Sequence, residues 1–164
     1  RMGEIVEIDT IQKSFDFFSE AKRNNDSIQK SQHLTGEIDL NYIESMITSQ
    51  VIAAIRSPFS PSKIKMWAAK KDGKYVGTII FQDSSGNNQN QSRMLYETVW
   101  IMWGKDTGKL SLKLLKTAER YAKDNSIPFI SMSRMTSTES GKRLGKIYER
   151  MGYHQDTATH IKKL

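Results

Sequence analysis

The stretch from Trp100 to Ala122, WIMWGKDTGKLSLKLLKTAERYA, has a residue order suited to binding chemistry. An apolar run ends at Gly104, the short loop KDTGK follows, and a helical pattern then begins. A strand, a glycine-containing loop and a helix N-terminus in this order can hold an anion. The first N–H groups of a helix have no partners within it, and the helix dipole favours negative charge. The stretch therefore predicts a phosphate-binding turn, unless Gly104 and Gly108 only shape the turn between strand and helix.

The nucleotide-binding motifs closest to this loop do not fit it. A P-loop reads G-x-x-x-x-G-K-[ST], with its hydroxyl on magnesium. Gly104 and Gly108 are one residue too close for this motif, and Leu110 stands where the hydroxyl is required. The dinucleotide pattern G-x-G-x-x-G does not occur here either. Any phosphate compound bound by this loop is therefore expected to belong to another class.

Composition limits the kinds of protein that this chain can be. At 164 residues with 37% hydrophobic content, it is long enough for one domain with a real core. No apolar run approaches the length of a membrane span, and no signal-peptide pattern is visible at the N-terminus. The chain has no cysteine, which excludes disulfides, thiolate nucleophiles and zinc–thiolate sites and fits a reducing cytoplasm. The net charge of +7 suits an anionic ligand, nucleic acid or an acidic partner, but also an ordinary solvated surface.

The first third of the chain predicts two helices. Residues 11–22 carry Ile11, Phe15, Phe18 and Ala21 at helical spacing after a candidate N-cap, Thr10. Residues 23–36 are polar and predict a loop. A second helix begins after Asp39 and ends at Ser57-Pro58. Its expected apolar face consists of Ile43, Met46, Ile47, Val51 and Ile55.

The remaining residues predict strands alternating with helices. Residues 63–71 and 74–82 form a hairpin around Asp72-Gly73, since this dipeptide favours a tight turn. Residues 84–91 predict a mobile loop. Further strands are expected at 94–103, 128–135 and 159–164, and helices at 109–123 and 139–151, the last ending at Gly152. This order predicts an α/β or α+β fold, with a mixed sheet and helices on its faces.

Three segments resemble the GNAT superfamily, the acetyl-CoA-dependent N-acetyltransferases. IYERMGYHQDTATHIKKL (147–164) resembles the C-terminal signature of the family, and AERYAKDNSI (118–127) the second half of its cofactor-binding helix. KKDGKYVGTIIF (70–81) resembles its hairpin. The resemblance implies a single domain over 4–164, with a mostly antiparallel sheet flanked by helices and a splayed strand pair at the cofactor cleft. The closing residues are similar to small GNAT-like proteins of tailed bacteriophages, which implies a phage-encoded protein.

The loop departs from the family pattern Arg/Gln-x-x-Gly-x-Gly/Ala. Aligning the helix by AERYA places Asp106 at the basic position, Lys109 at the central glycine and Ser111 at the small residue. Shifting the alignment by one residue matches Gly108 and puts Lys105 at the basic position and Leu110 at the small-residue position. The apolar face of the helix is then out of phase with that of the family. The resemblance implies coenzyme A binding, as acetyl-CoA, by one set of residues. They are Trp100, Ile101, Met102, Trp103, Asp106, Thr107, Gly108, Lys109, Leu110 and Ser111.

The same resemblance implies two catalytic side chains. Tyr148 matches the tyrosine that protonates the departing thiolate, and a phenol can supply that proton. Glu97 lies on the strand where relatives carry a general base. The alternatives are that Tyr148 packs on its helix and that Glu97 faces solvent or pairs with a lysine. His33, His154 and His160 have no ligand spacing, so we expect no metal site.

These residues predict a cytoplasmic N-acetyltransferase that moves an acetyl group from acetyl-CoA to an amine on a protein or a small molecule. The alternative is a GNAT-fold binding protein without transfer activity, which acts on a host protein, a virion component or DNA. In relatives the first two helices and their connection, here residues 21–37, select the acceptor. The cations Lys109, Lys113, Lys116, Arg120 and Lys123 share one helix face. That face predicts weak, non-specific nucleic-acid binding or simply a solvated surface, and the oligomeric state stays open.

Overall fold

The computed structural model describes residues 3–30, 37–56, 64–84 and 93–164, apart from the side chains of residues 54–56 and 84. One five-stranded sheet has its strands in chain order. The strands are β1 (Glu4–Glu7), β2 (Ile64–Lys71), β3 (Lys74–Ser84), β4 (Met94–Met102) and β5 (Phe129–Ser131). Neighbours are antiparallel except β4 and β5, which run parallel because a helix crosses between them. The predicted mixed, mostly antiparallel sheet is thereby confirmed, with β1 as a strand that the sequence patterns had not indicated.

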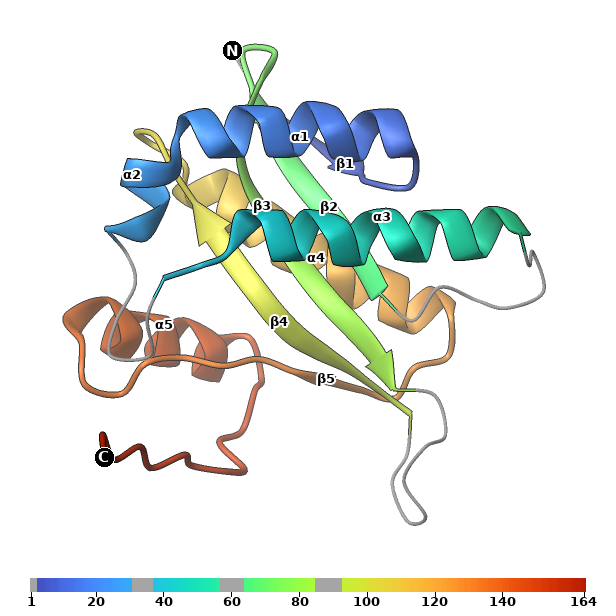
Figure 1. Cartoon of the computed structure of the whole chain (residues 1–164). Coiled ribbons are helices and arrows are strands. Elements are labelled where there is room, and N and C mark those ends of the chain that lie inside the picture. Colours follow the sequence, from blue (N-terminus) through green and yellow to red (C-terminus); the bar gives the residue numbers. More distant parts are fainter. Residues whose placement is uncertain (1–2, 31–36, 57–63, 85–92) are drawn as a thin grey trace. The chain divides into compact units, whose positions relative to one another are not determined.

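The helices that precede β2 in the described ranges are α1 (Ile11–Arg23), α2 (Asn25–Gln29) and α3 (Leu40–Arg56). Of these, α1 and α3 cover one face of the sheet (Figure 1). Thr10 caps α1 by accepting a hydrogen bond from the Lys13 N–H, and Asp39 accepts one from the Tyr42 N–H at the start of α3. Both predicted helix starts are therefore confirmed. The core beneath them contains Phe17, Phe18, Ile43, Ile47, Val51, Met66, Ile80, Ile101 and Trp103.

Two expectations for this region were wrong. Ile11 and Phe15 are exposed, because the buried stripe of α1 is Ser14, Phe17, Phe18 and Ala21, a complete i, i+3, i+4, i+7 set. The polar segment after Arg23 contains the short helix α2, which forms because Ile28 is fully buried. The Gln29 side-chain amide also exchanges two hydrogen bonds with the main chain of Ile38. The rest of the predicted loop, the helix-ending Ser57-Pro58, the side chain of Ile55 and the predicted mobile loop beyond Ser84 lie outside the described residues.

The predicted hairpin joins β2 to β3. Asp72 and Gly73 have φ angles of 53° and 77°, the left-handed pair that a two-residue type I′ turn requires. The ladder between β2 and β3 shifts register after Ala69, so Val76 is an additional residue in β3. The main-chain N–H of Tyr75, beside this irregularity, donates to the Glu20 carboxylate on α1 at 2.7 Å. The hairpin is therefore fixed to the helical layer as well as to the sheet.

The other face of the sheet carries α4 (Gly108–Asp124), behind the strands in Figure 1. Its buried side includes Leu110, Leu114, Leu115, Ala118 and Ala122. Arg93, at the start of β4, makes a two-point ion pair with the buried Asp83 and donates to the Asn125 carbonyl just beyond α4. Hydrogen bonding to Asp83 raises the pKa of the Arg93 guanidinium. This contact ties the C-terminal end of α4 to the sheet.

The chain divides into two compact units, one ending at Ser131 and one from Met132 to Leu164. In the second unit Thr138 caps α5 (Glu139–Arg150), and Gly152 follows with a φ of 88°. The Arg134 side chain lies against Gly145, where an added Cβ would come within 2.6 Å of its Nε atom. The assignment of residues 4–164 to one domain stays a prediction.

Two strand predictions near the C-terminus were wrong. Instead of residues 128–135, β5 covers only Phe129–Ser131. Residues 159–164 form no strand, since their only large apolar side chains, Ile161 and Leu164, are exposed and the segment pairs with no described strand. No helix in the described ranges is both long and apolar enough to cross a membrane.

Candidate functional site

β4 has a partner along one edge and only a short partner along the other. β3 pairs with it from Met94 to Met102, whereas β5 pairs only with Met94, Leu95 and Tyr96. Beyond Tyr96, β4 has no β5 partner in the part of the chain that the structure describes. β5 ends at Ser131, so no described strand pairs with this edge of β4 from Glu97 to Met102, and this unpaired stretch is called the opening beside β5 here.

Pleating decides which main-chain groups face this opening. The Trp103 N–H donates to the Val76 carbonyl at 2.8 Å, so the polar main-chain groups of Trp103 point toward β3. Main-chain directions alternate along a strand, which turns those of Ile101 toward β3 as well and those of Met102 toward the opening. A ligand lying beside β4 would thus meet the main chain of Met102 rather than that of Ile101.

The loop after β4 takes two residues through left-handed conformations. Gly104 has a φ of 88° and Asp106 a φ of 54°, a region that aspartate tolerates better than most residues. The Lys71 ammonium donates to the Lys105 carbonyl at 3.1 Å and lies 3.5 Å from the Asp106 carbonyl oxygen. These contacts with the hairpin hold the loop against the sheet.

The first turn of α4 lacks a side-chain cap. Thr107 occupies the N-cap position without a side-chain hydrogen bond to the helix, and the first turn contains no acidic residue. The Ser111 N–H donates to the Thr107 carbonyl, so the N–H groups of Gly108, Lys109 and Leu110 precede the first intrahelical bond. A Cβ added at Gly108 would meet no atom within 4 Å, so the space beside the first residue of the helix is open. This end of the helix is suited to a phosphate group.

Several of the predicted cofactor-binding residues bury their side chains. Ile101 and Trp103 lie in the core under α1 and α3, and the Trp103 ring lies 5.8 Å from that of Phe17. Leu110 is buried on the inner side of α4. The side chains of these three residues are therefore not available to a ligand, and only Leu110 offers a main-chain N–H outside the β3–β4 ladder. Trp100, Met102 and Ser111 are half-buried, and Asp106, Gly108 and Lys109 are exposed.

Glu97 lies beside a β-bulge that the sequence patterns did not predict. Ile80 pairs with Val99 and Phe81 with Glu97, so Thr98 is an additional residue in β4. The Thr98 hydroxyl donates to the Ile80 carbonyl at 3.1 Å and satisfies an acceptor within the interrupted ladder. The bulge places the half-buried Glu97 on the same face as Phe81, next to the opening beside β5.

Tyr148 is buried within the second unit. Its hydroxyl donates to the Ser133 carbonyl at 3.0 Å, and its ring centre lies 5.3 Å from that of Tyr153. The Tyr153 N–H also donates to the Tyr148 carbonyl. These contacts give Tyr148 a packing role, and its catalytic role stays a prediction.

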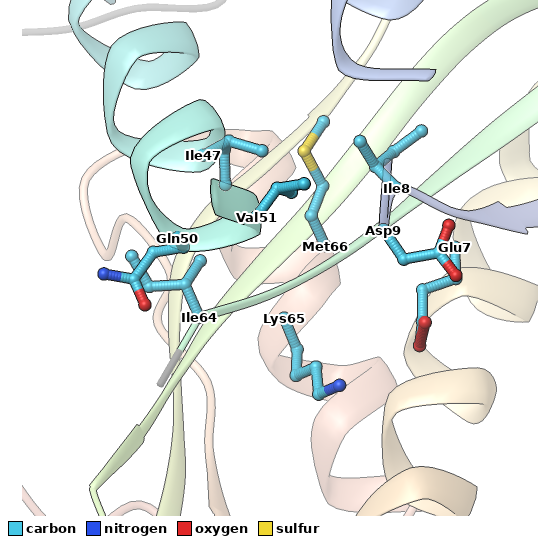
Figure 2. A pocket seen from close by; sticks show the side chains of 9 residues that line it. All are labelled: Glu7, Ile8, Asp9, Ile47, Gln50, Val51, Ile64, Lys65 and Met66. Carbon is cyan, nitrogen blue, oxygen red and sulfur yellow. The ribbon is translucent and has the colours of Figure 1, made fainter. Parts of the chain in front are cut away.

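A small cavity lies where α3, β1 and the start of β2 meet (Figure 2). Ile47, Val51 and Met66 form its apolar wall, with the carboxylates of Glu7 and Asp9 at one rim. Its volume is about 100 Å³, or about three water molecules' share of the liquid. The cavity is therefore far too small for coenzyme A.

The described residues contain no group of three or more His, Cys, Asp or Glu side chains that could hold a metal ion. His154 and His160 are exposed, and His33 lies outside the described residues.

Known proteins resemble this chain in structure but not in sequence. No family model matches the chain, and no curated protein matches its sequence. A ribosomal-protein-alanine N-acetyltransferase from Brucella melitensis biovar Abortus 2308 aligns with a TM-score of 0.64 and 15% identity over all of both chains. A predicted acetyltransferase from Clostridium acetobutylicum, solved with acetyl-CoA, aligns with a TM-score of 0.62 and 16% identity, covering 99% of this chain and 96% of its own.

A third similar structure is the aminoglycoside N-acetyltransferase AAC(6')-Iy in complex with CoA. It has a TM-score of 0.61 and 7% identity, with coverage of 99% of this chain and 95% of its own. At such identities the likeness concerns the arrangement of the chain. Together with the sheet order, it confirms that this protein has the fold of the GNAT acetyltransferases.

Proposed function

We propose that this protein is an N-acetyltransferase that binds acetyl-CoA in the opening beside β5. The observation that carries this proposal is the loss of β5 pairing after Tyr96, followed directly by the uncapped start of α4. A pantetheine arm has amide groups, and they would pair with the outward main chain of β4 near Met102. Two similar structures were solved with acetyl-CoA and with CoA, which supports this choice of ligand.

The start of α4 fits the pyrophosphate of coenzyme A. The N–H groups of Gly108, Lys109 and Leu110 would donate to it, and the helix dipole would add to the attraction. These donors do not depend on side-chain identity, so the loop can bind phosphate although it departs from the family pattern. Lys105 and Lys109 would supply the positive charge, and the Ser111 side chain is small enough to permit close approach.

Acetyl transfer would proceed by direct attack of an amine. The amine nitrogen bonds to the acetyl carbon, the carbon–sulfur bond breaks, and the thiolate leaves. Glu97 would accept the proton of the attacking nitrogen, directly or through water, and the Met102 N–H would polarise the thioester carbonyl. Tyr148 would protonate the thiolate after its hydroxyl turns away from the Ser133 carbonyl.

We propose an amine on a protein or a small molecule as the acceptor. The similar structures include enzymes of both kinds, a ribosomal-protein-alanine N-acetyltransferase and an aminoglycoside N-acetyltransferase. The proposed setting is the cytoplasm, or that of a host if a phage encodes the chain.

A second candidate is a GNAT-fold binding protein without transfer activity. The Asp106 carboxylate favours it, since this residue stands where the resembling family carries a basic side chain and would repel a nearby phosphate. Binding of acetyl-CoA without transfer to any amine would support this alternative.

Calorimetry with acetyl-CoA tests the proposal most directly. Gly108→Glu places a carboxylate at the open start of α4, where it should weaken acetyl-CoA binding at least about tenfold by repulsion. Asn41→Glu, at an exposed position in the first turn of α3, makes the same change of charge and should bind like the wild type. No heat from the wild type, or equal binding by Gly108→Glu, would refute the site. In a transfer assay Tyr148→Phe should lose about a hundredfold in rate with unchanged acetyl-CoA affinity.

A further inference from the structure

The outer face of α4 carries a line of positive charge. The line, called the α4 basic stripe here, consists of Lys109, Lys113, Lys116, Arg120 and Lys123. All five side chains are exposed. At about 100° per residue they fall within roughly a quarter of the helix circumference, opposite the buried leucines. From the first to the last, the stripe is about 21 Å long at 1.5 Å per residue.

These cations lack the partners that cations on α1 have. Lys13 pairs with Asp9 at 2.8 Å, and Lys22 pairs with Glu44 at 2.6 Å. Within the described ranges, none of the five cationic side chains of the α4 basic stripe forms an ion pair or a hydrogen bond. The two acidic residues of α4, Glu119 and Asp124, lie outside the stripe at its edges. The chain therefore leaves this charge unneutralised over most of the helix.

We propose that the α4 basic stripe binds the sugar–phosphate backbone of nucleic acid without reading its sequence. Consecutive members stand about 4.5–6 Å apart along the helix axis, and their long side chains can adjust to a row of phosphates. Each neutralised phosphate releases condensed counterions, which drives binding even where no base is contacted. This surface lies beyond the proposed acetyl-CoA site except at Lys109, and its function does not depend on acetyl transfer.

The chemistry of the stripe favours nucleic acid over an acidic protein. Protein interfaces have a dry centre rich in aromatic side chains and poor in charge. The α4 basic stripe has charged members throughout and includes no aromatic residue. A polyphosphate chain needs no such centre, because its affinity comes almost wholly from charge.

Two double variants of the full chain with the same net charge test this assignment. Lys113→Glu with Arg120→Glu reverses the middle of the stripe. Arg23→Glu with Lys30→Glu makes the same change at exposed positions near the ends of α1 and α2. The probes are mixed-sequence 30-nucleotide DNA and RNA, single-stranded and duplex, labelled for fluorescence anisotropy. Circular dichroism checks that both variants are folded.

We expect the wild type to bind the probes at 50 mM salt, with an affinity that falls steeply as salt increases. The stripe variant should bind at least about tenfold more weakly, with a salt slope lower by about two, while the control variant binds like the wild type. Equal weakening in both variants would overturn the assignment, since net charge alone would then explain the binding. Competition by poly-glutamate as strong as that by an oligonucleotide of equal charge, or no binding at low salt, would overturn it as well.

Discussion

Helices α1 and α4 pack on opposite faces of the same sheet, yet they differ in how their polar groups are satisfied. Thr10 caps α1, and two of its lysines pair with carboxylates. Thr107 makes no cap for α4, and in the described structure the outer cations of α4 have no acidic partner. The start and two lysines of α1 thus have partners within the chain. The N–H donors at the start of α4 and the cations on its outer face have none in the described structure. Free N–H donors and unpaired cations are the groups that an anionic ligand needs, so the difference supports the proposals that place ligands on α4 rather than on α1.

The largest expected effect concerns the C-terminal end of α4, which Arg93 ties to the sheet. Asp83→Ala should destabilise the fold by about 2 kcal/mol, because two charge-assisted hydrogen bonds from the partly exposed Arg93 guanidinium are lost. Urea denaturation measures the change. Asp124→Ala, at an exposed position in the last turn of α4, is the control and should change stability by less than about 0.5 kcal/mol. Equal effects would show that the Arg93–Asp83 pair does not anchor the helix.

A smaller effect compares the two helix starts. Thr10→Ala should cost about 1 kcal/mol, since it removes the hydrogen bond to the Lys13 N–H. Thr107→Ala should be close to neutral in the free protein, because the Thr107 side chain makes no such bond. Parallel urea titrations compare them. If Thr107→Ala lost as much stability as Thr10→Ala, the two helix starts would not differ in their capping.

The smallest effect is a dependence on pH. The Lys13 hydrogen bond lowers the pKa of Asp9 from its ordinary value of 3.8. The stability that the Lys13–Asp9 pair contributes is therefore present above pH 3.8. It is lost as pH falls through the lower pKa that Asp9 has in the folded protein. Both side chains are roughly half exposed and screened by solvent, so the loss should be less than about 0.5 kcal/mol.

Stability curves of the wild type and Lys13→Ala should converge in acid. Curves for Lys113→Ala should stay parallel to the wild type, since Lys113 has no acidic partner in the described structure. Curves for Lys13→Ala that run parallel to the wild type at every pH would contradict the linkage.

Sequence reasoning succeeded where local signals agree with packing. Asp72-Gly73 fixes the hairpin, Thr10 and Asp39 start their helices, and the strand–loop–helix order leading into α4 follows from the apolar periods. It failed where tertiary contacts decide the outcome. Ile28 gives α2 its buried anchor, and nothing in the closing residues supplies THIKKL with a strand partner.

The position of the candidate site was predicted from the order of strand, loop and helix more than from individual side chains. The loop and the start of α4 were foreseen, because glycines and a helix start leave local traces. The Thr98 bulge left none, since apolar residues stand at both odd and even positions of residues 94–102 and no alternation shows a change of phase. The Lys71 contact with the loop was also missed, because it joins residues far apart in the sequence.

The Thr98 bulge also has a consequence for how this strand can vary. One additional residue reverses the side-chain phase, so Leu95 and Glu97 face the α4 layer while Val99 and Ile101 face the α1–α3 layer. The two halves of β4 therefore belong to different cores, and each can change to suit its own neighbours. Deleting the single residue Thr98 would send Leu95 and Glu97 into the opposite layer, whereas substitutions on either side would stay local. Descendants of this chain should thus tolerate replacements throughout β4 far better than a change in its length.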